Sequence, residues 1–167
     1  MKEINQYRLL IKLFYFIFSL SILLFPIRGL FAFMENDITY LGEYSEQNTF
    51  SKLILFVFII KIVSKIIFFL GGFYLIKILK FEDIQEIFSD KNIFLFKKAG
   101  KLFITSSVVG TVVIWLDYFR NGIGNLKGNN DFLYSLYFSA IVGLFLLIFS
   151  KILEKAKELK QENDLTI

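Results

Sequence analysis

Four long apolar stretches constrain this chain more than any other feature of its sequence. They predict helices at about residues 9–34, 52–80, 102–119 and 132–160. A helix rises about 1.5 Å per residue, so about 20 mostly apolar residues cross the roughly 30 Å hydrocarbon core of a bilayer. The expected fold is therefore an all-α membrane protein, a four-transmembrane-helix bundle that forms a single integral membrane domain over residues 1–167.

Composition supports lipid as the solvent of these helices. Of the 167 residues, 56% are hydrophobic and 22 are Phe, too many large apolar side chains for one aqueous core of this size. A signal peptide is the alternative for the first stretch, but the bulky residues 29–34 offer no small-x-small cleavage site.

The distribution of Lys and Arg predicts the orientation. Thirteen of these residues fall on the side of the two termini and four on the other. Because cytoplasmic loops carry the excess of positive charge, we expect a multi-pass protein of the bacterial inner membrane, the cell membrane, with both termini cytoplasmic. The net charge of +4 then reflects contact with anionic lipid, and no direct nucleic-acid binding is expected.

Two cytoplasmic segments carry helical periodicity. The connector at residues 81–101 repeats Phe81, Ile84, Ile87 and Phe88 among acidic residues, which predicts an amphipathic connector helix. Beyond about Leu153, apolar residues continue at helical spacing, so we expect the fourth helix to extend into the cytoplasm as a helical C-terminal tail.

Two lysines interrupt the second apolar stretch. Lys61, Ser64 and Lys65 share one face of the predicted helix, which should look into the bundle. A basic residue at the centre of a membrane helix costs about 2.5 to 3.5 kcal/mol, so partners, water or loss of the proton must compensate. Either these lysines specify how the helices pack, or they line a polar cavity.

Partners for the lysines are few in the sequence. Asp117 is the only acidic residue within the apolar part of a predicted span. It shares a helix face with Ser106, and it is the expected partner of Lys61. Lys65 would have to use hydroxyls such as Ser139 or reach water. The intramembrane polar candidates are thus Lys61, Ser64, Lys65, Asp117, Ser106 and Ser139.

The sequence has few of the residue types that usually carry out catalysis. Neither Cys nor His is present, which removes thiolate nucleophiles, imidazole bases and most transition-metal sites. A dyad of Lys65 with Ser64, Ser106 or Ser107 is the formal alternative. We predict no enzyme, no metal and no cofactor.

Two motifs carry a family resemblance. The run D-K-N-I-F-L-F-K-K-A-G-K-L begins at Asp90, and the ending I-L-E-K-A-K-E-L-K-Q-E-N-D-L-T-I begins at Ile152. On these motifs, nearly the whole chain resembles the bacterial family catalogued as domain of unknown function 2975. Members typically have Asn-Pro-Phe where this chain has Asn92-Ile93-Phe94, so the rigidity of that proline is absent.

The resemblance implies a four-span inner-membrane protein without established activity, often encoded beside a helix-turn-helix transcription regulator. The leading hypothesis is a non-enzymatic membrane regulator that contacts a cytoplasmic protein, with that regulator as the first candidate. The alternative is a small transporter, channel or ligand-sensing bundle that uses Lys61 and Lys65; the oligomeric state stays open. The cytoplasmic interaction candidates are Asn92, Phe94, Glu162, Asn163, Asp164, Leu165, Thr166 and Ile167.

Overall fold

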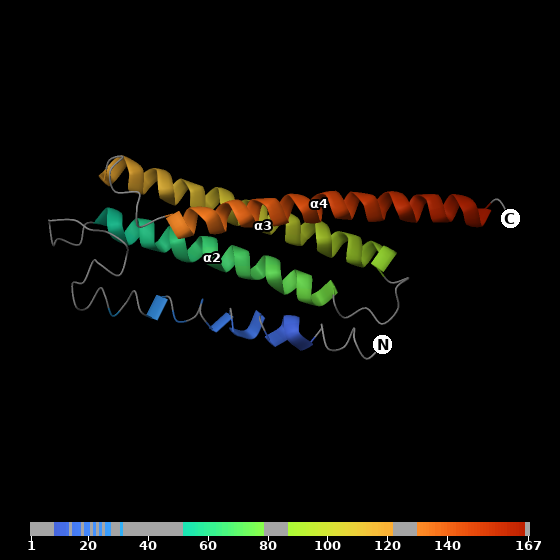
Figure 1. Ribbon diagram of the computed structural model, residues 1–167, viewed down its shortest axis with the longest axis horizontal. Coiled ribbons are helices and arrows are strands. Elements are labelled where there is room, and N and C mark those ends of the chain that lie inside the picture. Colours follow the sequence, from blue (N-terminus) through green and yellow to red (C-terminus); the bar gives the residue numbers. More distant parts are fainter. Residues whose placement is uncertain are drawn as a thin grey trace.

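Three long helices form the described core of the protein. The computed structural model describes residues 52–78, 87–121 and 130–165, together with scattered residues between 9 and 31; side chains are described within 56–78, 87–116 and 133–163 and for those scattered residues. The helices are α2 (Lys52–Ile78), α3 (Asp90–Asn121) and α4 (Asn130–Leu165), and this part of the chain is entirely helical (Figure 1).

Each of the three helices is long and apolar enough to cross a membrane. The qualifying segments are Phe56–Ile78, Asp90–Leu116 and Leu133–Asn163. The all-helical, multi-pass membrane class predicted from the sequence is therefore supported. The first predicted helix, 9–34, is described only at scattered positions, so the count of four spans stays a prediction.

The start of α3 differs from the sequence-based boundary. It begins at Asp90 and not near residue 102, so residues 90–101 are its first three turns and not a separate connector. Ser89 caps this end: its Oγ accepts the Asn92 N–H at 3.3 Å and its carbonyl accepts the Ile93 N–H at 3.0 Å. Asp90 also places negative charge at the positive end of the helix dipole.

The rest of the predicted connector is only partly described. Ile87 and Phe88 form a single 3₁₀ turn before α3, while Phe81 and Ile84 lie outside the described residues. The bounds of α2 and α4 lie within a few residues of those predicted, 52–80 and 132–160.

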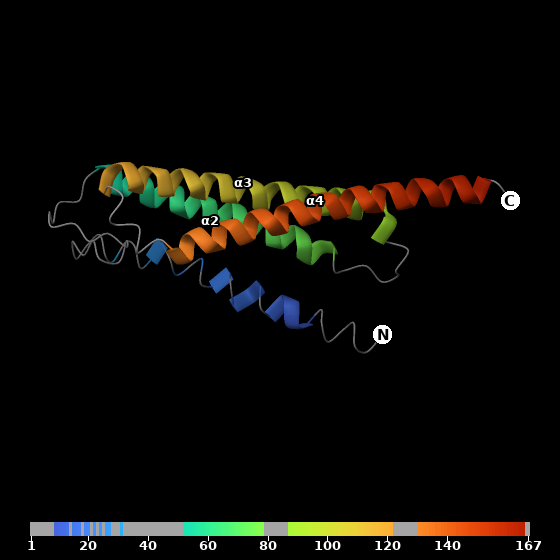
Figure 2. The same cartoon turned by 45° about the horizontal axis from the view of Figure 1, so that its top comes forward.

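The three helices run antiparallel in chain order, with α3 packed on both α2 and α4. Both ribbon views show α4 extending well beyond the ends of its two neighbours (Figures 1 and 2). The end of the bundle that carries this extension also carries the end of α2 and the start of α3.

Burial along the helices follows a seven-residue repeat. On α2 the buried positions are spaced by seven: Val57, Ser64, Gly71 and Ile78. On α4 they alternate by three and four: Leu136, Ser139, Gly143, Leu146, Ser150 and Leu153. This spacing is typical of left-handed packing at about 20° between axes. Ser135, four residues before Ser139, lies off this line and is exposed.

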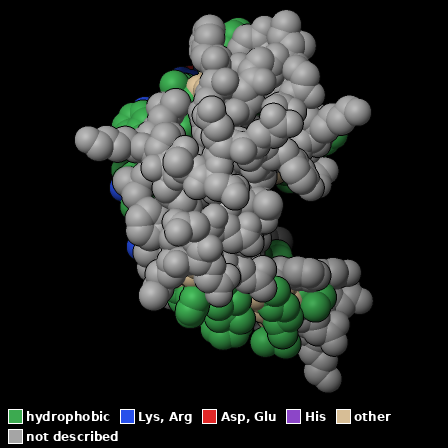
Figure 3. Space-filling model, turned by 90° about the vertical axis from the view of Figure 1, so that its left-hand side faces the viewer, with side chains coloured by type: hydrophobic (Ala, Val, Ile, Leu, Met, Phe, Trp, Pro, Cys, Tyr) green, Lys and Arg blue, Asp and Glu red, His purple; other side chains and the backbone are tan. Residues whose placement is uncertain are grey.

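The outer surface of the bundle is apolar. On α4, Phe138, Ile141 and Phe145 are each more than 60% exposed. The described part of the face in Figure 3 is predominantly hydrophobic as well. Such a surface is costly in water and suits contact with lipid chains.

Candidate functional site

The centre of the α2–α3 contact is a reciprocal pair of serines. Ser64 Oγ donates to the Ser106 carbonyl at 2.9 Å, and Ser106 Oγ donates to the Ser64 carbonyl at 2.9 Å. The two Oγ atoms lie 3.3 Å apart, and both residues are 2% exposed. In an apolar environment such hydroxyls need a partner, and here each helix supplies the partner for the other.

The α3–α4 contact repeats this exchange with different partners. Ser107 Oγ donates to the Leu136 carbonyl at 2.9 Å, and Ser139 Oγ donates to the Phe103 carbonyl at 3.0 Å. Of the predicted polar candidates, Ser64, Ser106 and Ser139 therefore all serve helix packing. The three hydroxyls considered for a dyad with Lys65, on Ser64, Ser106 and Ser107, donate to backbone carbonyls.

Both intramembrane lysines lie on one side of the buried line of α2. Lys61 and Lys65 are each half-buried, whereas Ser64 between them is buried. The face that looks into the bundle is thus centred on Ser64 and Gly71, displaced from the predicted face of Lys61, Ser64 and Lys65. This displacement places both lysines at the edge of the α2–α3 contact.

The flank of α2 that carries Lys65 meets the first segment of the chain. The Tyr15 hydroxyl donates to the Phe69 carbonyl at 3.1 Å, and the two rings stack with centroids 4.7 Å apart. A Cβ added at Gly72 would lie 2.9 Å from the Tyr15 ring. Gly72 is two turns beyond Lys65 on the same side of the helix, so this side faces Tyr15.

The side chain of Asp117, the predicted partner of Lys61, lies outside the described side chains, so the pair stays a prediction. The backbone nevertheless gives the height of Asp117 along the bundle axis. In the antiparallel pair of α2 and α3, Ser64 lies beside Ser106 and Tyr74 lies beside Lys98, so Asp117 lies at the height of about residue 54 of α2. Lys61 is about seven residues, or roughly 10 Å, deeper along the axis, a gap that both side chains would have to bridge.

A cluster of lysines and aromatic rings, which sequence reasoning missed, joins the end of α2 to the first turns of α3. Lys98 Nζ of α3 lies 4.5 Å from the Tyr74 ring centroid and 5.7 Å from that of Phe94. Lys77 Nζ of α2 lies 4.6 Å from the Phe73 centroid and 5.5 Å from that of Tyr74. The signal was an aromatic residue three or four positions before a lysine on each helix.

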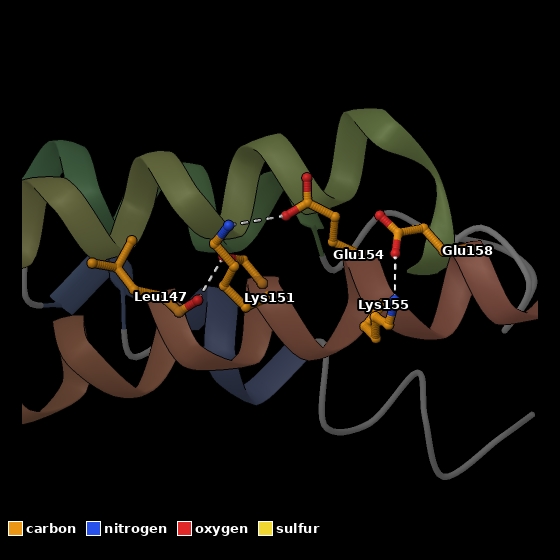
Figure 4. Close-up of polar contacts among 6 residues, drawn as sticks. Leu147, Lys151, Glu154, Lys155 and Glu158 are labelled. Atoms are coloured by element: carbon orange, nitrogen blue, oxygen red, sulfur yellow. Dashed lines mark hydrogen bonds and ion pairs between the residues drawn. The ribbon is translucent and has the colours of Figure 1, made fainter.

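Three lysines toward the end of α4 have acidic partners instead. Lys151 Nζ lies 3.5 Å from Glu154 Oε2, and Lys155 Nζ lies 3.0 Å from Glu158 Oε2 (Figure 4). Lys157 forms an ion pair with Asp90 at the start of α3. This last contact ties the extension to the neighbouring helix.

The predicted cytoplasmic candidates divide into two groups. Asn92 is buried and Phe94 is 59% exposed, both in the first turns of α3. Glu162 and Asn163 are exposed on the last turns of α4. The side chains of Asp164 and Leu165, and all of Thr166 and Ile167, lie outside the description.

Metal ligands do not gather within the described part of the chain, where no group of three or more Asp, Glu, His or Cys residues could hold an ion. The structure is that of a multi-pass helical membrane protein. Its buried serines hold the helices together, and lysines at one end contact either aromatic rings or the carboxylates of α4 and Asp90.

A family model described as a protein of unknown function (DUF2975) matches residues 40–167. The chain therefore belongs to the DUF2975 family. No curated protein and no solved structure matches it.

Proposed function

We propose that this chain is a non-enzymatic membrane regulator that acts on a cytoplasmic protein through the extension of α4. The length of α4 carries the proposal. Its 36 residues make a helix of about 54 Å, whereas about 20 residues cross the hydrocarbon core. After the buried Leu153 the helix continues for twelve residues to Leu165.

The extension is rich in charge and exposes an apolar side. Leu159 is 52% exposed and Ile152 is 57% exposed, and because they are seven residues apart they share one face. The ion pairs within α4 support the helix, and the pair between Lys157 and Asp90 ties the extension to α3. A preformed helix loses little conformational freedom when a partner binds, which favours binding.

The excess of Lys and Arg at this end supports a cytoplasmic location for the extension. The first turns of α3, with the exposed Phe94, belong to the same end because Asp90 contacts Lys157. We therefore propose one interaction surface made from the extension and the start of α3. A helix-turn-helix transcription regulator encoded nearby is the first partner to test, as the family resemblance implies.

A quantitative pull-down from detergent-solubilised membranes tests this proposal. The bait is the full chain, compared with a chain lacking residues 160–167 and with a chain in which those eight residues are permuted. Permutation keeps length and charge, so loss of one cytoplasmic protein from both altered baits supports recognition of the sequence. Recovery of the same partners with all three baits would count against docking on the extension.

The second candidate function is transport or sensing of an anion or proton at Lys61 and Lys65. The observation that favours it is their half-buried position in the middle of α2, where a cationic side chain is costly. If the lysines line a polar path, replacing both with Leu abolishes activity while the protein stays in the membrane. Val63→Leu, on the exposed side of the same turn, is the control.

An unchanged phenotype at unchanged abundance in the Lys61→Leu, Lys65→Leu double variant would remove this second candidate. The same result would leave the proposal for the α4 extension intact. The two functions are therefore separable by experiment.

A further inference from the structure

The lysine–aromatic cluster consists of Phe73, Tyr74 and Lys77 on α2 with Phe94 and Lys98 on α3. Both ammonium groups lie against the Tyr74 ring, at 4.5 Å for Lys98 and 5.5 Å for Lys77. Each also lies against a second ring on its own helix. One positive charge from each helix thus lies against the same ring at the α2–α3 contact.

These two lysines differ from three lysines of α4 in the groups that contact them. Lys151, Lys155 and Lys157 each have a carboxylate within ion-pair distance. Within the described part of the chain, the contacts of Lys77 and Lys98 are with aromatic side chains. A ring face attracts a cation but carries no net charge, so no carboxylate among the described residues balances the positive charge of the cluster.

The cluster faces outward at the membrane boundary. Phe73 is 41% exposed, Phe94 is 59% exposed, and Lys77 is exposed. Lys77 lies in the last turn of α2, and the charged residues Lys80, Glu82 and Asp83 follow it in the sequence. The rings therefore face the lipid chains, while the ammonium groups lie where the headgroups begin.

We infer that the lysine–aromatic cluster binds the phosphate of an anionic phospholipid headgroup. Each ammonium group can donate a charge-assisted hydrogen bond to a phosphate beside the Tyr74 ring, and the Tyr74 hydroxyl adds a further donor. Basic sites between membrane helices favour such headgroups, and the exposed rings can hold the first segments of the acyl chains. The inference goes beyond the proposed regulator and needs only that the chain resides in a membrane.

Lipid-dependent stability of the full chain tests the inference. The protein is purified in a neutral detergent and its apparent affinity for phosphatidylglycerol is measured from the thermal shift on titration, with phosphatidylcholine as the lipid control. Lys77→Gln with Lys98→Gln should weaken this affinity by about twenty-five-fold, because each lysine near an anionic surface contributes on the order of a factor of five.

The matched control is Lys151→Gln with Lys155→Gln, which removes the same two charges from the ion-paired region of α4. It should leave the affinity within about twofold of the unaltered chain. An equal loss in both double variants, or no loss in either, would overturn the inference, because bulk charge alone would then explain the result.

Two further arms complete the test. Inorganic phosphate, at concentrations matching the lipid phosphate and up to a hundredfold above, should produce no comparable shift; an equal shift would assign the site to a soluble phosphate compound and overturn the lipid assignment. If the Lys77, Lys98 variant does not fold, a phosphatidylglycerol analogue with a photoreactive headgroup is used on the unaltered chain. Cross-links at Phe73, Tyr74 or Phe94 support the site, and cross-links confined to other residues overturn it.

Discussion

The two contacts of α3 are built in different ways. Against α4, two backbones approach closely: a Cβ added at Gly143 would lie 2.8 Å from the Gly100 carbonyl oxygen and 3.0 Å from the Ile104 amide nitrogen. Against α2, a Cβ added at Gly71 would lie 3.3 Å from the Phe103 ring, and Phe68 packs on the same ring with centroids 4.9 Å apart.

The difference shows that two helix contacts in one membrane bundle can be stabilised by different interactions. Without a hydrophobic driving force between helices, association relies on close packing and on hydrogen bonds. The α3–α4 contact fixes the distance between two backbones and leaves no room for a side chain. The α2–α3 contact uses a ring that can shift, together with the Ser64–Ser106 exchange.

The largest effect is expected at Gly143. Gly143→Ala places a methyl group against the backbone of α3, which cannot move without separating the helices. We expect a loss of about 2 kcal/mol in the free energy of unfolding, measured by titration with a denaturing detergent. Ile141→Leu, on the exposed side of α4, is the control and should be neutral; an equally neutral Gly143→Ala would refute the close backbone contact.

The serine exchange ranks second. Ser64→Ala with Ser106→Ala removes both hydroxyls and should cost about 1 kcal/mol in the same assay, since interhelical hydrogen bonds in membranes average about 0.6 kcal/mol each. Thr105→Ala is the matched control, because its hydroxyl donates at 2.8 Å to the Lys101 carbonyl within α3. A cost no larger than that of the control would mean that the serines contribute only their small size.

Gly71→Ala sharpens the comparison from the α2 side. The added methyl group meets the edge of a ring, and the gain in helix propensity offsets the crowding. The change in the free energy of unfolding should therefore stay within about 0.5 kcal/mol. A loss as large as that of Gly143→Ala would show that both contacts are equally rigid and would break the distinction.

The smallest effect is expected for the ion pair outside the packed region. Lys157→Gln removes the contact with Asp90, and an exposed pair of this kind contributes about 0.5 kcal/mol or less. The difference should disappear in high salt, whereas the effect of Gly143→Ala should persist. A salt-independent loss above 1 kcal/mol would contradict this ranking.

Prediction from the sequence succeeded where composition alone decides the structure. The apolar stretches gave the class, and the bounds of α2 and α4 lie within a few residues of those predicted. It failed at the start of α3 because the polar residues 90–101 were assigned to the surface connector. The cap at Ser89 shows that one helix runs through them.

The candidate site was predictable in its residues but not in its contacts. Ser64, Ser106 and Ser139 were identified as costly polar groups, yet their partners are backbone carbonyls on neighbouring helices. Because every residue has a backbone carbonyl, no residue type indicates which carbonyl accepts the hydrogen bond from a serine hydroxyl. The lysine–aromatic cluster was missed because its members come from two helices.

The residues themselves determined that this chain is helical, that it belongs in lipid and that its family is DUF2975. Only the tertiary structure decided which side of each helix is packed. A helix in water shows its buried side as an apolar stripe, but a helix in lipid is apolar all round. The packed sides, centred on Ser64 of α2 and Gly143 of α4, are instead set by where small residues let two backbones approach.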